Sequence, residues 1–292
     1  MDVFLIGAPK TGTTAIAHYL EEHIMVDFCS VKEPNFFSSD LVGGDRAAAD
    51  LCEYHRLYEN DGRIRVEAST TYLYSDYAIT KILEINPNAK FIVGIRNYVD
   101  LAQSQYKQML KVGFEDKYRF QSAWDLSTKR KKGLCIPSSC TIPVDIQYDE
   151  IISLGKYVET VVDRVGSEKV FIYKYEDLNA DFNKVFGDIL EFIGLPVQEI
   201  EVVERKNPTL VPHSLLLSRF IQMLTIARKR FGLISGFGFG ELLRNWNSGK
   251  SDVYDLTDYE KMLVVNFSKS DYEVLSSVVK MFGVSIDDYR KI

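Results

Sequence analysis

Short apolar runs alternate with longer amphipathic stretches along this chain, and this alternation restricts the possible folds more than any other feature. The apolar runs cover residues 3–6, 64–66, 91–95 and 170–173. The amphipathic stretches cover residues 13–22, 75–85, 99–111, 149–165 and 182–193. Continuous apolar runs are typical of strands that are covered on both faces, and crossovers through helices make such strands parallel. We therefore predict an α/β protein with a central parallel sheet flanked by helices, in one domain over residues 1–292.

Composition limits the class of protein and its partners. With 292 residues and 46% apolar side chains, the chain can bury a substantial core and is not disordered. A formal net charge of −6 argues against electrostatic binding of nucleic acid, anionic lipid or a long polyanionic polysaccharide. The net charge does not exclude a local basic groove. The overall charge favours a neutral or cationic partner.

Targeting signals and cysteines indicate the compartment. No apolar run approaches the roughly 20 residues that span a bilayer, and the stretch DVFLIG at residues 2–7 lacks the basic region of a secretory signal. We expect a cytoplasmic chain without a membrane partner. The four cysteines are too few for a disulfide scaffold, so we expect reduced thiols, with a local disulfide between Cys135 and Cys140 as the alternative.

Residues 113–147 break the alternation. They carry the run KRKK at residues 129–132, followed by a cluster of Pro, Ser and Cys without clear periodicity. We predict an irregular surface excursion that either serves as a lid or, as charge runs usually do, simply faces solvent.

The strongest local motif is GAPKTGTT at residues 7–14, between the first predicted strand and the first predicted helix. Glycines permit a tight turn close to an anion, and a helix start offers unpaired N–H groups and a positive dipole end. This pattern predicts a phosphate-binding loop. Its lysine is Lys10, inside the loop, and Thr13 follows the second glycine, where the Walker A motif requires lysine. A nucleoside triphosphatase is therefore disfavoured.

A second motif, FIVGIRNYVDLAQSQY at residues 91–106, places an arginine at the end of a strand and a serine on the following helix. Arg96 can offer a planar pair of donors to a phosphate, and Ser104 can add a hydroxyl about two helical turns later. The alternative is that Arg96 pairs with Asp100 and that Ser104 is merely solvated.

These two motifs resemble those of the sulfotransferases that use 3′-phosphoadenosine 5′-phosphosulfate (PAPS) and release 3′-phosphoadenosine 5′-phosphate (PAP). The resemblance implies a P-loop NTPase-like fold, Lys10 on the bridging oxygen of the donor, and no metal. It also implies that Gly249 and Lys250, in the stretch NSGKSD, belong to a loop that closes over the nucleotide. The binding residues that it implies are Pro9, Lys10, Thr11, Gly12, Thr13 and Thr14 for the 5′-phosphosulfate, and Arg96 and Ser104 for the 3′-phosphate.

The stretch VKEPNFFS at residues 31–38 resembles the segment that supplies a glutamate base in the heparan 3-O class. By this resemblance Glu33 is the catalytic base, and the alternative is an ordinary ion pair with Lys32 or Arg63. Aryl and steroid sulfotransferases use a histidine instead, but none of the four histidines here lies in a matching context.

We predict further acceptor contacts at Glu67, Tyr72 and Phe37. Glu67 lies at the end of a predicted strand, which in open α/β sheets points into the ligand crevice, so it can orient the acceptor or share the role of base. Tyr72 and Phe37 either line an acceptor pocket or belong to the core.

Two departures from the carbohydrate class bear on the acceptor. That class often has lysine at the position of Ala68 and histidine at the position of Asn35. Their absence favours a small acceptor, neutral or cationic, and the chain resembles bacterial enzymes that tailor natural products, including those that sulfate guanidinium toxins. The alternatives are a kinase-like phosphoryl transferase and a nucleotide-binding scaffold without activity.

Overall fold

The computed structural model describes residues 2–42, 46–197, 210–230 and 239–290, and it divides the chain into two compact units. The first, which we call the sheet unit, comprises Met1–Tyr98, Ser153–Glu204 and Ser268–Lys291. The second, which we call the helical unit, comprises Val99–Ile152 and Arg205–Phe267, together with Ile292. Two helices, α5 (Tyr98–Val112) and α14 (Asp258–Lys280), contribute residues to both units.

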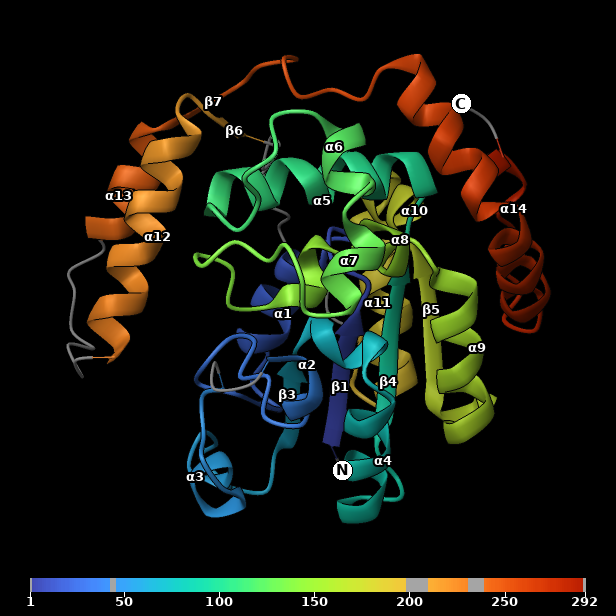
Figure 1. Ribbon diagram of the computed structural model, residues 1–292. Helices are drawn as coiled ribbons and strands as arrows, with labels where there is room; N and C mark the ends of the chain where they lie inside the picture. The colour runs from blue at the N-terminus through green and yellow to red at the C-terminus, as the bar shows by residue number, and fades with distance from the viewer. Residues whose placement is uncertain (1, 43–45, 198–209, 231–238, 291–292) are drawn as a thin grey trace. The chain divides into compact units, whose positions relative to one another are not determined.

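The sheet unit is built on five parallel strands in the order β2-β3-β1-β4-β5 (Figure 1). This arrangement confirms the predicted α/β class, and each of the four predicted strands is present. The strands are β1 (Asp2–Gly7), β2 (Val26–Phe28), β3 (Ile64–Ala68), β4 (Lys90–Ile95) and β5 (Val170–Lys174).

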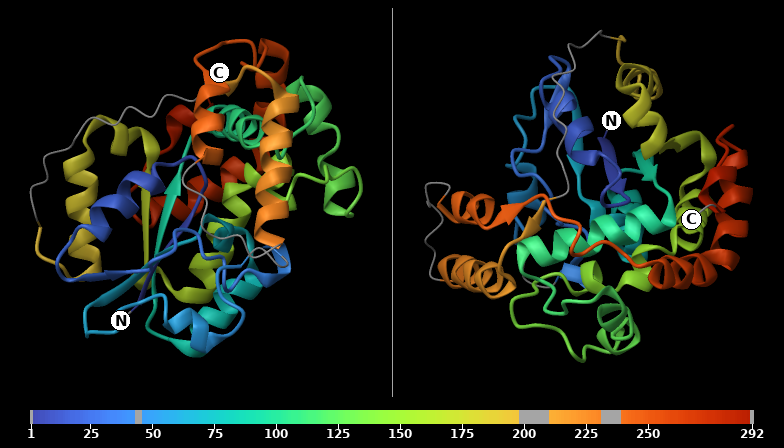
Figure 2. Two further views of the ribbon diagram at one scale, coloured as in Figure 1. Left: turned by 90° about the vertical axis from the view of Figure 1, so that its left-hand side faces the viewer. Right: turned by 90° about the horizontal axis from the view of Figure 1, so that it is seen from above.

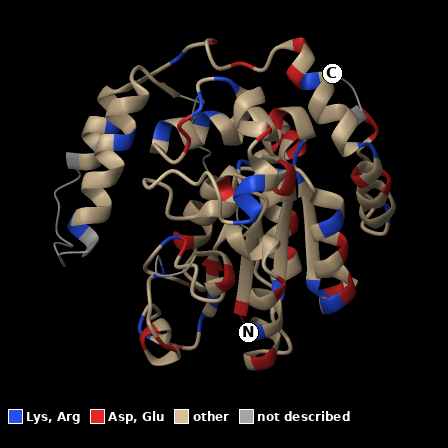
Figure 3. Ribbon diagram, viewed as in Figure 1, with Lys and Arg blue, Asp and Glu red and all other residues tan. Residues whose placement is uncertain are grey.

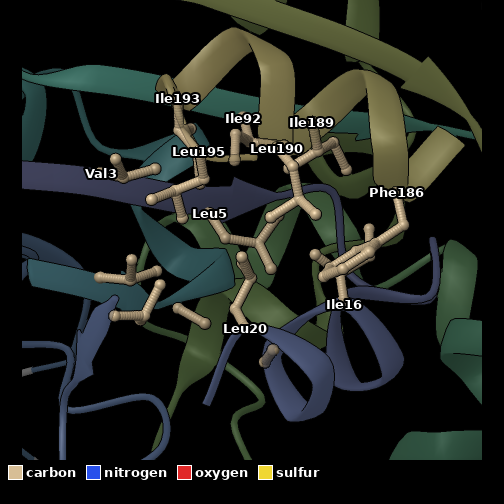
Figure 4. Close-up of a cluster of buried hydrophobic side chains, with 14 of the residues drawn as sticks. Val3, Leu5, Ile16, Leu20, Ile92, Phe186, Ile189, Leu190, Ile193 and Leu195 are labelled. Atoms are coloured by element: carbon tan, nitrogen blue, oxygen red, sulfur yellow. The ribbon is translucent and has the colours of Figure 1, made fainter. Parts of the chain in front are cut away.

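Helices α1 (Thr13–Glu21) and α11 (Phe182–Ile193) cover one face of this sheet, as the core cluster in Figure 4 shows. On the opposite face the rings of Phe4 and Phe91 stack with centroids 5.7 Å apart, because neighbouring residues of a strand point to opposite sides. The cluster of Figure 4 includes Val3, Leu5 and Ile92 from the strands, Ile16 and Leu20 from α1, and Phe186, Ile189, Leu190 and Ile193 from α11.

The remaining elements of the sheet unit are mostly short. They are α2 (Ser39–Val42), α3 (Leu51–His55), η1 (Thr70–Tyr74), α4 (Asp76–Ile85), α9 (Leu154–Val165), η3 (Ser167–Lys169), α10 (Tyr175–Ala180) and η4 (Asp287–Arg290). The helix predicted over 149–165 is in fact two helices, α8 (Tyr148–Ile151) and α9, separated at residues 152–153.

The helical unit contains α6 (Phe120–Trp124), α7 (Ser127–Lys131), η2 (Pro143–Ile146), α8, α12 (Leu215–Arg230) and α13 (Phe239–Trp246). Two short strands, β6 (Val211–Pro212) and β7 (Ser248–Gly249), pair antiparallel beside α12 and α13. Within the described ranges, no helix has the length and apolar character needed to cross a membrane.

Residues 113–147, which we predicted to be irregular, contain three short helices, α6, α7 and η2, joined by segments without regular secondary structure, and a role as a lid stays a prediction. Arg130, inside the basic run, does not face solvent. Its guanidinium binds the carboxylate of Glu115 through Nη1–Oε2 (2.7 Å) and Nη2–Oε1 (2.8 Å), and both side chains are 0% exposed. Tyr148 donates a further hydrogen bond of 2.9 Å to Glu115. Arg130 is therefore buried, although it lies in a basic run, because it pairs with the buried carboxylate of Glu115.

Candidate active site

The loop between β1 and α1 has the backbone of an anion-binding turn. Gly12 precedes the first residue of α1 and has φ 86°, in the left-handed region that favours glycine. A Cβ atom at this position would lie 2.5 Å from Leu178 Cδ2, so a larger residue fits only if the leucine side chain shifts. The turn therefore needs glycine both for its conformation and for its packing, and it leads directly into α1, whose first N–H groups are the kind that bind anions.

Strand β4 holds this loop from the side. The buried hydroxyl of Thr11 donates to the carbonyl of Ala8 (2.6 Å), and the amide of Ala8 donates to the carbonyl of Gly94 (2.6 Å). A Cβ atom on Gly94 would lie 2.4 Å from Thr11 Oγ1. Because the hydroxyl of Thr11 is used inside the protein, it supports the loop in this structure.

Arg96, directly after β4, contacts the same loop. Its Nη1 donates to the carbonyl of Lys10 (2.9 Å), and its guanidinium carbon lies 4.2 Å from the ring centroid of Tyr175. The Nε of Arg96 is buried and has no hydrogen-bond partner among the described residues. The structure thus brings together the lysine loop and the arginine, which are 86 residues apart in sequence. A planar cation with an unsatisfied donor, beside the turn that precedes α1, fits a ligand that carries phosphate groups.

Three other predicted nucleotide contacts belong to the helical unit. Ser104 is buried on α5, six residues after the helix begins at Tyr98. Gly249 lies on β7, where a Cβ atom would come 2.7 Å from His213 Cε1, and Lys250 is exposed. Their contact with a nucleotide stays a prediction.

Glu33 lies next to the carboxyl end of β3. Its amide donates to the carbonyl of Ala68 (3.0 Å), and its backbone is left-handed with φ 52°. One carboxylate oxygen lies 3.6 Å from Lys32 Nζ, and the other accepts a long hydrogen bond from Thr70 (3.5 Å). The ion pair with Lys32 is therefore present, whereas Arg63 pairs with Asp61. The partly exposed carboxylate is in a position from which it can accept a proton, and its role as base stays a prediction.

Lys32 also contacts the phosphate-binding loop. Its Nζ donates to Thr14 Oγ1 (2.9 Å), so one ammonium joins the start of α1 to Glu33. Reasoning from sequence identified Lys32 only as a partner of its neighbour. It missed the contact with Thr14 because 18 residues separate the two and no local pattern links them.

Glu67 is buried in the sheet unit. Its carboxylate accepts hydrogen bonds from Tyr54 (2.5 Å) and Ser69 (2.7 Å), and a third from the hydroxyl of Tyr72. Burial raises the pKa of Glu67 above its ordinary value, and the three donors oppose this shift. Phe37 is also buried, with its ring centroid 5.9 Å from that of Tyr72. Three predicted acceptor contacts, Glu67, Tyr72 and Phe37, are thus core residues in this structure, and their contact with an acceptor stays a prediction.

The histidines of the sheet unit lie away from the loop. His55 contacts Arg65, which binds Asp2 at the amino end of β1, the opposite end from Gly7. His18 lies in the last turn of α1, 3.4 Å from Glu22. His23 follows that helix and accepts a hydrogen bond from the amide of Met25. In the part of the chain that the structure describes, no three side chains of His, Cys, Asp or Glu form a group that could hold a metal, and all four cysteines are free.

Comparisons with known proteins agree with this geometry. The model of the sulfotransferase domain family matches residues 1–209. A bifunctional heparan sulfate N-deacetylase/N-sulfotransferase 1 from Caenorhabditis elegans is 22% identical over 219 residues, which are 74% of this chain and 24% of that protein. A human heparan sulfate glucosamine 3-O-sulfotransferase 6 is 32% identical over 108 residues, which are 36% of this chain and 30% of that protein. The matches therefore span less than a third of either relative.

Solved structures show the same fold. A sulfotransferase from Alicyclobacillus acidocaldarius has a TM-score of 0.71 at 19% identity, covering 99% of this chain and 98% of that one. A mouse sulfotransferase complexed with PAP has a TM-score of 0.54 at 14% identity, covering 97% of this chain and 88% of that one. With the family model matched over more than two thirds of the 292 residues, and with the loop and the arginine in contact, the chain belongs to the sulfotransferase domain family.

Proposed function

We propose that this protein transfers a sulfuryl group from PAPS to a hydroxyl or amine of a small-molecule acceptor. In this reaction the acceptor oxygen or nitrogen forms a bond to sulfur, the bond from sulfur to the 5′-phosphate oxygen breaks, and PAP leaves. The acceptor loses one proton to a base. The observation that carries the proposal is the hydrogen bond between Arg96 and the carbonyl of Lys10, because it brings the two sets of anion-binding groups to one edge of the sheet.

The residues of the loop neutralise the charge of the donor. The N–H groups at the start of α1 and the ammonium of Lys10 would hold the 5′-phosphosulfate, and Lys10 would stabilise the bridging oxygen as it gains charge. Arg96 would bind the 3′-phosphate with its planar guanidinium, which Tyr175 supports from one side. Sulfuryl transfer, like phosphoryl transfer, depends mostly on such positioning and neutralisation.

Glu33 and Lys32 would act on the acceptor side. Glu33 is the partly exposed carboxylate beside the loop and would take the proton of the acceptor. Lys32, already on the hydroxyl of Thr14, would provide a second positive charge for the sulfuryl oxygens. Ala68 stands at the end of β3 where the carbohydrate class often has a lysine, and in this chain the ammonium of Lys32 would supply a positive charge instead, from its contacts with Thr14 and Glu33.

A small acceptor is supported by the site and by the overall charge. Asn35 stands where the carbohydrate class often has histidine, and its side chain is occupied by Thr71 (2.8 Å) and by the carbonyl of Glu33 (2.9 Å). The excess of acidic residues repels a polyanionic sugar chain. We accordingly propose a neutral or cationic natural product, such as a guanidinium compound, as acceptor and the cytoplasm as the compartment.

Calorimetric titration followed by turnover tests this proposal. PAP should bind without Mg²⁺, and PAPS should be consumed when a mixture of small alcohols, phenols and amines is added. Tight PAP binding without turnover on any acceptor would instead indicate a nucleotide-binding scaffold. Preference for ATP with Mg²⁺ over PAP would indicate a phosphoryl transferase.

The Arg96→Ala variant tests the observation that carries the proposal. It should weaken PAP binding by about 1.5–3 kcal/mol, the value of a charged hydrogen bond. Arg164→Ala is the matched control, because Arg164 makes an exposed ion pair with Asp76 and should leave PAP affinity unchanged. Equal affinity of Arg96→Ala and the native protein would remove Arg96 from the site.

A further inference from the structure

The backbone that follows Arg96 is held by a residue from the far end of the sequence. Arg96 and Asn97 form the two-residue connection between β4 and α5. The amide of Asn97 donates to Glu176 Oε1 (3.1 Å), and the hydroxyl of Tyr289 donates to Glu176 Oε2 (2.7 Å). One carboxylate of α10 therefore joins the connection after Arg96 to Tyr289 in η4.

The same part of the chain contacts the other neighbour of Tyr175, the aromatic residue that supports Arg96. The ring centroid of Tyr175 lies 4.2 Å from the guanidinium carbon of Arg96. Lys174 precedes this tyrosine at the end of β5, and its Nζ lies 3.3 Å from Asp288 Oδ1 and 5.6 Å from the ring centroid of Tyr289. Residues of η4 thus contact the chain directly before and directly after the ring that stacks on Arg96.

The second half of α14 holds Tyr98, the first residue of α5. It packs against the start of α9 (Figures 1 and 2), and Asp271 accepts the amide of Gly155 (2.7 Å) and the hydroxyl of Tyr98 (3.0 Å). The rings of Tyr98 and Tyr289 meet edge to face with centroids 6.3 Å apart. We call residues 268–290 the C-terminal segment. Its contacts with the residues around Arg96 depend on acidic side chains, which Figure 3 marks in red.

Tyr289 is an interior residue with a hydroxyl that keeps its proton. Its side chain is 2% exposed, and that of Tyr98 is 1% exposed. Burial and the nearby carboxylate of Glu176 raise the pKa of Tyr289 above its ordinary value. The hydroxyl therefore acts as a donor at neutral pH, and a hydrogen bond from a hydroxyl to a carboxylate is short and strong.

We infer that Tyr289 is a positioning residue for Arg96, and that through Glu176 it sets the preference of the site for nucleotides that carry a 3′-phosphate. The inference rests on the proposed function, in which Arg96 binds the 3′-phosphate of PAP. Glu176 binds the amide after Arg96 and is the neighbour of Tyr175 under the guanidinium. Without the hydroxyl of Tyr289, one oxygen of Glu176 loses its donor, and the supports of Arg96 become less fixed.

Calorimetric titration of the full chain with PAP and with adenosine 5′-phosphate tests this inference, because the two nucleotides differ only in the 3′-phosphate. Tyr289→Phe should weaken PAP binding about three- to tenfold, the effect of one hydrogen bond, and should leave the affinity for adenosine 5′-phosphate unchanged. A merely structural role would weaken both nucleotides alike. An unchanged ratio of the two affinities in Tyr289→Phe would overturn the inference.

Substitutions of Glu176 test the connecting residue independently of Tyr289. Glu176→Ala should lower the ratio of the two affinities at least as much as Tyr289→Phe does. Glu176→Gln should keep part of the preference, because its amide oxygen can still accept from the amide of Asn97. If Glu176→Gln and Glu176→Ala both keep the native ratio, Glu176 does not carry the effect and the inference is wrong.

Tyr54→Phe is the matched control. Tyr54 is also a buried tyrosine of the sheet unit, and its hydroxyl donates to the carboxylate of Glu67 (2.5 Å). The control should keep the native preference for PAP over adenosine 5′-phosphate. A loss of preference in Tyr54→Phe equal to that in Tyr289→Phe would show that any lost buried hydroxyl has this effect, and would contradict a specific role of Tyr289.

A double-mutant cycle tests whether Tyr289 acts through Arg96. In the Arg96→Ala background, Tyr289→Phe should cause no further loss of PAP affinity, because the group that it positions is already absent. Independent losses in the double variant would place the effect of Tyr289 elsewhere and would overturn the inference. Circular dichroism of each variant confirms that the affinities are measured on folded protein.

The outcomes separate this inference from the proposed function. If the native chain prefers PAP and Arg96→Ala removes that preference, the proposed nucleotide site stands. An unchanged preference in both Tyr289→Phe and Glu176→Ala would then refute only the positioning role. If the native chain binds adenosine 5′-phosphate as tightly as PAP, the assignment of Arg96 fails and the inference fails with it.

Discussion

At the scale of single residues, the ammonium of Lys32 occupies a position that local sequence does not reveal. It contacts the hydroxyl of Thr14 and the carboxylate of Glu33, which come from different segments of the sheet unit. A cation between a phosphate-binding loop and a carboxylate can neutralise charge on the donor and can also position the base. Lys32 and Glu33 therefore need separate tests.

Replacing Lys32 tests the second cation. Lys32→Ala should lower kcat about 10- to 100-fold, the loss of one charged hydrogen bond in the transition state, and Lys32→Arg should restore part of it. Lys81→Ala, which breaks an exposed ion pair with Glu84, is the control and should keep full activity. Steady-state kinetics with PAPS measures both, and an unchanged kcat for Lys32→Ala would exclude the role.

Replacing Glu33 tests the base. Glu33→Gln should lower kcat by about 10²- to 10⁴-fold, because a positioned base typically contributes that factor. PAP affinity should remain close to that of the native protein, since the carboxylate does not hold the nucleotide in this proposal. Rapid-quench turnover and PAP titration separate the two effects. A fully active Glu33→Gln would place the base on another residue.

The buried carboxylate of Glu67 predicts a pH dependence of stability. Burial raises its pKa above the unfolded value near 4.5, so the native state holds the proton more tightly than the unfolded chain. This contribution is fully present below the unfolded pKa and is lost as pH rises through the folded pKa. The free energy of unfolding of the native protein, relative to that of Glu67→Gln, should therefore fall as pH rises from about 4.5 toward neutrality. Urea titrations across that range measure it, and a flat difference would contradict the raised pKa.

At the scale of elements, strong apolar runs predicted the strands of the sheet core, and amphipathic periods predicted α1, α4, α5 and α11. Strand β2 was missed because it has three residues and contains Asp27, whose buried carboxylate accepts the amides of Glu59 (3.0 Å) and Asn60 (2.9 Å). Helices α6 and α7 were missed because the basic run suggested a solvent-exposed segment. Arg130 of α7 is instead buried against Glu115, 15 residues away. Sequence reveals local periodicity, whereas these features depend on polar contacts over longer separations.

The same limit applies to the candidate site. The loop at residues 7–14 and the residue Arg96 were recognisable from local motifs, and the structure brings Lys10 and Arg96 into contact. Lys32 was not recognised because its partner Thr14 lies in another segment. The burial of Glu67 was not foreseen either, since its donors come from α3, η1 and the turn between β3 and η1.

The turn before α1 offers a test at this scale. Gly12→Ala should destabilise the fold and abolish PAP binding, because it adds backbone strain and a Cβ atom 2.5 Å from Leu178. Gly62→Ala is the matched control, since Gly62 also has positive φ (93°) but no atom within 4 Å of the added Cβ. That control should lose only about 1 kcal/mol and keep PAP affinity. Equal effects of the two substitutions would show that the contact with Leu178 is unimportant.

At the scale of the whole molecule, each unit has its own interior. The sheet unit is centred on apolar residues between the strands and α11, whereas the helical unit buries the ion pair between Arg130 and Glu115. Buried ion pairs are costly to break from one side and can often be replaced by apolar residues of similar size. The stability of the helical unit therefore depends on keeping both partners.

A double-mutant comparison tests this dependence. Arg130→Met alone should lower the free energy of unfolding of the helical unit by about 3–5 kcal/mol, because it leaves the Glu115 carboxylate buried and unpaired. Combining it with Glu115→Leu should restore most of the loss. Hydrogen exchange of amides in α6 and α7 measures the effect within this unit. Additive losses in the double variant would contradict a paired role.

Asp271, in the second half of α14, caps the amino end of α9. Its carboxylate accepts the amides of Gly155 (2.7 Å) and Lys156 (2.9 Å) and the hydroxyl of Tyr98 (3.0 Å). The region that the family model matches ends at residue 209, so this aspartate lies outside it. A gene fragment trimmed to that homology boundary would encode the nucleotide loop and every strand of the five-stranded sheet, and yet its product would lack the carboxylate that caps α9.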